Sequence, residues 1–143
     1  VCPESRWPFI GSPITARPPD DAYVEATNAR ATQYQSVPQK LDHILSCLTH
    51  GLPVVFGANI FTAFESVGVA QTGVVPMPKD DERAIGGHAQ VIVGWLPNHQ
   101  LFIVRNSWGE QWGDSGYCYM PRDYILHPGL CSDFWAVFLT SRD

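Results

Sequence analysis

The residues with the clearest potential for chemistry are a histidine and an asparagine at the ends of two apolar segments. His88 follows two glycines and begins the segment that runs to Leu96, and Asn106 ends the next one, residues 101–106. The spacing accommodates two strands of about seven residues and a short turn, so a hairpin would bring the two side chains together. An asparagine fixes the tautomer of a neighbouring histidine without adding a full negative charge, which suits a histidine that serves a nucleophile.

Two tryptophans follow Asn106 in a glycine-rich loop. Trp108 and Trp112 are expected to shield the pair of side chains from water and so to strengthen its hydrogen bond. Glycines at positions 109, 113 and 116 would let the loop turn tightly around the indoles. A lone histidine near a strand is more often structural, and a lone asparagine often marks a turn. The combination with the tryptophan-glycine loop is what favours a catalytic base and its orienting partner.

The elements that position these residues are predicted from periodicity and from breaks. Residues 38–50 are predicted as a helix with an apolar stripe, with Pro38 in its first turn and Gly51 as its stop. A second helix is predicted over residues 22–31, after two aspartates. One or two helical turns are expected within residues 59–67, extended chain over 68–77 and a surface loop over 76–87. Strands are predicted over residues 53–56, 89–96, 101–106, 116–120 and 134–140. Helices that precede antiparallel strands indicate the α+β class.

The composition excludes several classes of protein. Of 143 residues, 45% are apolar and the net charge is -5, so the chain has enough apolar residues for a core. The absence of a run of lysines and arginines argues against nucleic acid as a partner. No apolar stretch is long enough for a membrane span, so no membrane partner is expected. The four cysteines show no metal-ligand spacing, which leaves disulfides and free thiols both open, and no metal or cofactor is expected.

Two segments closely resemble the C-terminal half of papain-like cysteine peptidases. Residues 87–95 fit the family pattern G-H-A-x-x-x-V-G-[YW], and residues 106–117 fit N-S-W-G-x-x-W-G-x-x-G-Y. Residues 1–8, VCPESRWP, are similar to a stretch found in many bacterial-type members. The resemblance covers nearly the whole chain. It implies a papain-like right-hand domain, in which an antiparallel, partly barrel-like sheet carries flanking helices. Residues 1–35 would form a proline-rich lead-in and a helix, and residues 36–143 the sheet subdomain.

The same resemblance implies roles for five residues. His88 would be the general base and acid that shares a proton with a cysteine thiolate, and Asn106 would orient its imidazole. Trp108 would cover their hydrogen bond. The backbone of Gly86 and Gly87 would border the substrate cleft. The implied reaction is peptide-bond hydrolysis through an acyl-enzyme.

The nucleophile of the family is not found in this sequence. Its motif, Q-x-x-x-C-[GS]-x-C-[WF], is absent, and no glutamine is placed to serve as the oxyanion donor. Cys2 precedes a proline in the lead-in, Cys47 lies inside a predicted helix, and the other two cysteines follow Asn106. Together with a start at Val1 rather than Met, this predicts the C-terminal portion of a cysteine-type peptidase whose N-terminal half carries the nucleophile.

This chain alone is then expected to be inactive. Its expected partners are a peptide or protein substrate and the missing N-terminal half. The alternative is a non-catalytic papain-like pseudoenzyme or protein-binding module. A soluble protein is expected; the sequence is compatible with secretion but does not decide the compartment.

Overall fold

The computed structural model describes residues 2–8 and 15–139 of the chain. These divide into two compact units, residues 2–8 and 15–34 with 138–139, and Gln35–Val137. All of the predicted site residues lie in the second unit.

The first unit contains the helix α1 (Asp20–Ala26). Asp20 and Asp21 stand in its first turn, where negative charge favours a helix N-terminus, and the Arg17 guanidinium lies 2.9 Å from the Asp20 carboxylate. The predicted helix over residues 22–31 is therefore present but shorter. The strand β1 (Ala31–Ser36) follows it and was not predicted, because all six of its residues are exposed and no alternating apolar pattern marks it.

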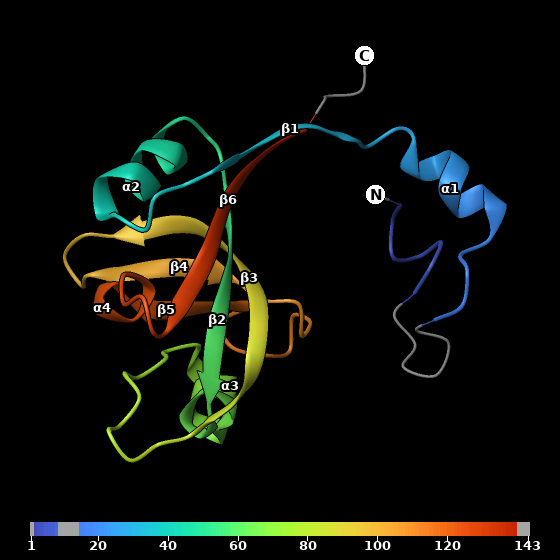
Figure 1. Cartoon of the computed structure of the whole chain (residues 1–143). Coiled ribbons are helices and arrows are strands. Elements are labelled where there is room, and N and C mark those ends of the chain that lie inside the picture. The colour runs from blue at the N-terminus through green and yellow to red at the C-terminus, as the bar shows by residue number, and fades with distance from the viewer. Residues whose placement is uncertain (1, 9–14, 140–143) are drawn as a thin grey trace. The chain divides into compact units, whose positions relative to one another are not determined.

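Six strands of the described residues form one sheet, in the order β1-β6-β2-β3-β4-β5 (Figure 1). The strands of the second unit are β2 (Val54–Phe61), β3 (Ala84–Leu96), β4 (Leu101–Arg105) and β5 (Tyr117–Pro121), and β6 spans Cys131–Leu139. From β6 to β5, each strand pairs antiparallel with its neighbour. The predicted α+β class is confirmed, and the predicted hairpin is formed by β3 and β4. The sheet is open.

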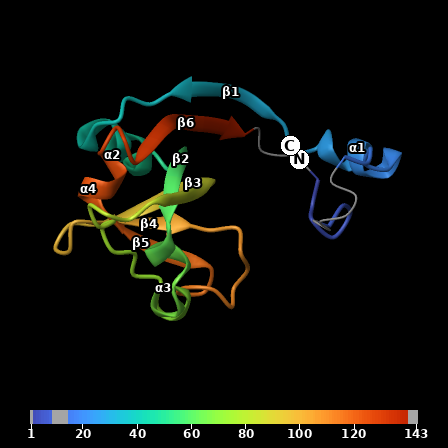
Figure 2. The same ribbon diagram turned by 60° about the horizontal axis from the view of Figure 1, so that its bottom comes forward.

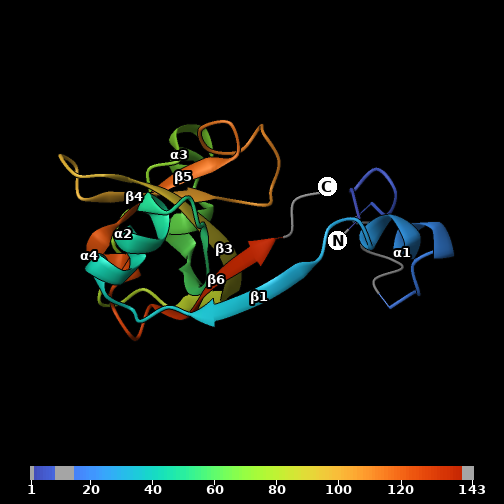
Figure 3. The same ribbon diagram turned by 90° about the horizontal axis from the view of Figure 1, so that it is seen from above.

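The helices of the second unit lie in two places. The helix α2 (Leu41–Thr49) contacts β2 and β3, and α4 (Arg122–Ile125) contacts β4 and β5. The 3-10 helix η1 (Thr62–Glu65) and the helix α3 (Val67–Thr72) follow β2 directly. Figures 2 and 3 show α2 beside α4, with α3 apart from both. Over residues 2–8 and 15–139, no helix has the length and apolar character that a membrane span needs.

Two helix predictions are corrected by the structure. Pro38 is not in the first turn of α2, because Lys40 is still extended and the Val37 N–H donates to the Phe134 carbonyl. The side-chain amide nitrogen of Gln39 also lies within hydrogen-bonding distance of three carbonyl oxygens around α4 and β6, which holds this segment outside the helix. Gly51 ends α2 as predicted, with a positive φ of 72°.

The second correction concerns residues 68–77, which were predicted as extended. They begin with α3, because the Ser66 side chain accepts a hydrogen bond from the Val69 N–H and caps the helix. Gly73 then ends the helix in the left-handed conformation. Chain beyond Gly73 is extended, and Val74 forms a β-bridge with Tyr119.

The core of the second unit lies between the sheet and the helices that cover it. Fully buried apolar side chains come from every strand from β2 to β5 and from α2, η1 and α4. They include Ile44, Val54, Phe56, Phe64, Ile92, Phe102, Val104, Met120 and Ile125. Burial of this apolar surface is the main force that fixes the sheet, and with it the positions of the site residues.

Candidate active site

The hairpin brings His88 and Asn106 together as the sequence predicted. His88 lies on β3 opposite Ala58 of β2, and Asn106 follows the last residue of β4. The register pairs Val91 with Arg105, so the chain just past the end of β4 runs beside residues 88–90 of β3, and Asn106 comes within reach of His88. The His88 Nε2 and Asn106 Oδ1 atoms are 2.8 Å apart, which is hydrogen-bonding distance.

The backbone fixes which way the Asn106 amide faces. The Ser107 N–H also donates to Asn106 Oδ1, at 2.8 Å, and an N–H group can only donate. The atom between Ser107 and His88 must therefore be the oxygen, so Nε2 carries the proton and donates it. Asn106 is 8% exposed, which protects this geometry from water. Nδ1 of His88 has no hydrogen-bond partner in the part of the chain that the structure describes, and it is left as the basic nitrogen of the ring.

Trp108 covers the imidazole. Its ring stacks on the His88 ring with centroids 5.1 Å apart and an interplanar angle of 25°. Its indole is held edge-on by Phe64 and Trp112, at 5.6 and 5.1 Å. Phe64 in turn stacks on Trp112 at 5.5 Å. The predicted indole shield is thus one part of a three-ring cluster, and Trp108 itself is 41% exposed.

The loop after Asn106 depends on its glycines. Gly109, Gly113 and Gly116 all have positive φ, a conformation that other residues rarely adopt. A Cβ at Gly113 would also collide with the Tyr117 carbonyl oxygen. These positions therefore let the loop fold back so that the Asn106 N–H reaches the Gly116 carbonyl at 2.9 Å.

A hollow of about 290 Å³ adjoins His88. Gly87 lines it together with His88, Gly57 of β2 and Ser132 of β6. Gly86 lies one position earlier, opposite Ile60, and is exposed without lining the hollow. A Cβ at Gly86 or Gly87 would meet no atom within 4 Å, so the surface beside His88 is open to an approaching molecule.

The structure shows the four cysteines as free thiols. Cys118 and Cys131 are buried, and desolvation raises the pKa of each thiol to about 12. Both are therefore neutral at physiological pH and poor nucleophiles. Cys2 and Cys47 are half-buried. Within Gln35–Val137, no thiol forms a hydrogen bond with the His88 ring.

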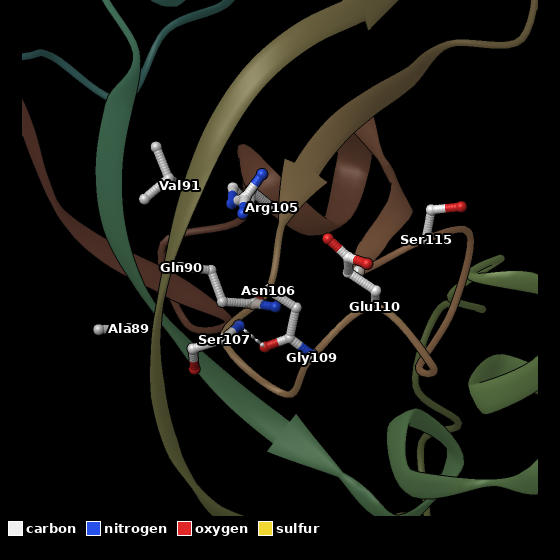
Figure 4. Close-up of a pocket in the computed structure, with 10 residues that line it drawn as sticks. Ala89, Gln90, Val91, Arg105, Asn106, Ser107, Gly109, Glu110 and Ser115 are labelled. Carbon is white, nitrogen blue, oxygen red and sulfur yellow. Dashed lines mark hydrogen bonds between the residues drawn. The ribbon is translucent and has the colours of Figure 1, made fainter. Parts of the chain in front are cut away.

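Two residues near the site were not predicted. Phe64 supports Trp108 from η1, which precedes β3 in sequence, so only tertiary packing brings it there. Gln90 is a 2% exposed amide on β3 and lines a second cavity, together with Asn106 (Figure 4). A polar residue within the apolar segment that begins at His88 is the signal that would have found Gln90.

In the part of the chain that the structure describes, residues 2–8 and 15–139, no group of three or more histidine, cysteine or acidic side chains is arranged to hold a metal ion.

An imidazole that an asparagine orients on an antiparallel sheet is an arrangement that serves nucleophilic hydrolases. Residues 8–135 match the family model of the papain family of cysteine proteases, and the chain belongs to this family. Xylellain, a cysteine protease from Xylella fastidiosa, is similar in structure, with a TM-score of 0.84 and 34% identity over 96% of this chain and 56% of that one.

Two curated relatives agree with this assignment. An uncharacterized peptidase C1-like protein of Acanthamoeba polyphaga mimivirus is 40% identical over 96% of this chain and 47% of its own length. Procathepsin L of Felis catus is 26% identical over 76% of this chain and 33% of its own length. The chain thus spans about half or less of the relatives that it matches.

Proposed function

We propose that this chain supplies the histidine and asparagine of a cysteine peptidase, which hydrolyses peptide bonds through a thiolate and an acyl-enzyme. The observation that carries the proposal is the 2.8 Å contact between His88 Nε2 and Asn106 Oδ1, with the amide direction fixed by Ser107. It leaves Nδ1 of His88 as the atom that exchanges a proton with a nucleophile.

In the proposed reaction His88 takes the proton of a cysteine thiol at Nδ1. The imidazolium that results is paired with the thiolate, because the neutral amide of Asn106 does not compensate its charge. The thiolate attacks the peptide carbonyl, and His88 returns the proton to the departing amine. His88 then removes a proton from water, which hydrolyses the thioester and frees the thiolate.

The thiolate is proposed to come from a protein segment outside this sequence. Cys118 and Cys131 are buried with raised pKa values, which suits packing rather than attack. Within Gln35–Val137, Cys47 has no hydrogen bond to His88 that would activate it. A nucleophile-bearing partner segment is consistent with relatives that are about twice as long as this chain or longer.

Trp108 and the two glycines have supporting roles in this proposal. The indole of Trp108 lies over the imidazole and limits the access of water to its hydrogen bond. The open backbone at Gly86 and Gly87 gives an extended peptide room to lie beside His88. The substrate class proposed is therefore a peptide or an unfolded protein segment.

The test is a peptide-hydrolysis assay on the full-length protein and two histidine variants. His88→Ala is expected to lower kcat/KM by at least about 10³-fold, because it removes the general base and acid. His99→Ala, in the exposed turn between β3 and β4, is the matched control and should retain activity. Equal activity of all three proteins would contradict the assignment. A full-length protein with no peptidase activity would favour the alternative, a non-catalytic papain-like binding module.

A further inference from the structure

A second cavity lies on the side of Asn106 that faces β3. It has a volume of about 330 Å³ and is lined by Gln90, Asn106 and the loop after Asn106. Arg105, Glu110 and Ser115 also line it. In Figure 4 the Gln90 side chain runs from β3 toward the end of β4, where Asn106 begins. The cavity is therefore bordered by the proposed orienting residue of the catalytic histidine.

Gln90 and Asn106 are the two buried polar side chains of the described residues, at 2% and 8% exposure. Each has one buried atom that lacks a hydrogen-bond partner within the described part of the chain, and the two atoms are complementary. Asn106 Nδ2 is a donor and Gln90 Oε1 is an acceptor. Buried polar groups without partners destabilise a protein, so two such groups on one cavity point to a shared partner.

The direction of the Asn106 amide is set by its other contacts. Asn106 Oδ1 accepts from His88 and Ser107, which leaves Nδ2 as the atom without a partner among the described residues. Gln90 Nε2 lies 4.0 Å from the Cys118 sulfur, a weak acceptor, and Gln90 Oε1 is the atom of this amide without a described partner. The Asn106 amide cannot turn over without losing its contacts with His88 and Ser107.

We propose that Gln90 is a positioning residue for Asn106, and that one bridging water molecule accepts a hydrogen bond from Asn106 Nδ2 and donates one to Gln90 Oε1. Both residues line the same cavity, and the two amides would give such a water a donor and an acceptor. The proposal rests on the function proposed above. A chain of hydrogen bonds from Cys118 through Gln90 and Asn106 to His88 then holds the imidazole in one tautomer and one orientation.

An apolar residue at position 90 would pack equally well on the buried face of β3, as Ile92 does two positions later. It would leave Asn106 Nδ2 buried without an acceptor. The Asn106 amide would then be less firmly held, and its hydrogen bond would fix the orientation of the His88 imidazole less well. Gln90 thus influences the reaction through Asn106, without touching the substrate.

The test uses the full-length protein and three variants. Gln90→Met keeps the length of the side chain but removes the acceptor, Gln90→Glu keeps an acceptor, and Ile92→Val is the control for loss of packing on the same face. We expect Gln90→Met to lower kcat about tenfold with KM unchanged, which is the effect typical of removing an outer hydrogen-bond partner. Gln90→Glu should recover most of the rate, and Ile92→Val should keep it.

A second readout does not depend on activity. The side-chain amide protons of Asn106 should exchange faster with solvent in Gln90→Met than in the wild type or in Ile92→Val, as measured by NMR. Equal kcat in Gln90→Met and the wild type, or equal exchange of the Asn106 amide, would overturn the proposal.

If Gln90→Met does not fold, the same comparison is made with Gln90→Glu. The exchange of the Asn106 amide in this variant should stay close to that of the wild type, and fast exchange there would overturn the proposal. A wild type without peptidase activity would refute the proposed function alone, because amide exchange would still decide the role of Gln90.

Discussion

Two parts of the strand β3, a site end at His88 and a core end at Ile92, show how the same face of one sheet serves opposite purposes. Alternate residues of a strand share a face, so His88, Gln90 and Ile92 form one row. At the core end Ile92 is fully buried and is paired with Val54 and Val104. At the site end His88 is half-exposed and holds a hydrogen bond to Asn106. Gln90 lies between them, buried but polar.

The difference is one of tolerance. The core end needs apolar volume, which several residue types can supply at a moderate cost in stability. The site end needs particular atoms at particular distances, such as the Nε2–H donor of His88 and the Oδ1 acceptor of Asn106. Substitutions at the core end should therefore change the free energy of unfolding, and substitutions at the site end should change the rate of the reaction.

The largest effect on stability is expected at Phe102, which is fully buried on β4 and lies 4.6 Å from the Trp95 ring. Phe102→Ala should lower the free energy of unfolding by about 3–5 kcal/mol, because it removes a buried ring and leaves a cavity. The specific activity per folded molecule should stay unchanged. Urea unfolding of the full-length protein, with peptidase assays below the transition, measures both. A large fall in the activity of the folded fraction would break the separation between the two ends.

The opposite outcome is expected at Asn106. Asn106→Ala should lower kcat/KM about 10²-fold, because the imidazole loses the acceptor that fixes its tautomer. Its free energy of unfolding should fall by only about 1 kcal/mol, since the hydrogen bond from the Ser107 N–H is also lost. Asn98→Ala, in the exposed turn, is the matched control. Loss of activity that merely follows loss of folded protein would show that Asn106 is structural.

The buried thiols should behave as part of the core. Because burial raises the pKa of Cys118 and Cys131 to about 12, they keep their protons in the folded state while the unfolded thiols ionise near pH 8.5–9. The unfolded state is then favoured as pH rises. At pH 10 each buried thiol should lower the free energy of unfolding by about 1.4 kcal/mol relative to neutral pH. Urea midpoints of the full-length protein between pH 8 and 10, under reducing conditions, measure this loss. Cys131→Ala should show a shallower fall, and an identical fall would argue that this thiol is not responsible.

A smaller effect on catalysis is expected when Trp108, the aromatic cover of His88, is removed. Trp108→Ala should lower kcat/KM by about tenfold, because water gains access to the hydrogen bond between His88 and Asn106. Trp95→Ala is the comparison, since Trp95 packs on Phe102 at the core end. It should lower the unfolding free energy without changing the kcat/KM of the folded protein. If both tryptophan variants lowered kcat/KM equally, the cover would have no specific role.

The sequence predicted the parts of this molecule that local pattern determines. The His88–Asn106 contact follows from two adjacent strands and a short turn, so the spacing alone was sufficient. The helix α2 was predicted from its apolar stripe. The start of α2 was not, because it depends on the contacts of Gln39 with distant carbonyls.

The support around the site was harder to predict, since it comes from distant segments. Phe64 reaches Trp108 from η1, and no local pattern connects the two. The role proposed for Gln90 depends on two unpartnered amide atoms that line one cavity, which only the folded chain reveals. The strand β1 lacked a signal because its side chains are all exposed.

The central claim is that the His88–Asn106 pair serves a thiolate from outside this sequence. The most direct measurement is the rate at which a thiol-directed epoxide alkylates the full-length protein near pH 6, followed by peptide mapping, in the wild type and in His88→Ala. We predict rapid labelling of one cysteine outside these 143 residues, slowed more than about 10²-fold in His88→Ala because the thiolate loses its imidazolium partner. Equal rates in the two proteins, or a label on Cys2, Cys47, Cys118 or Cys131, would contradict it.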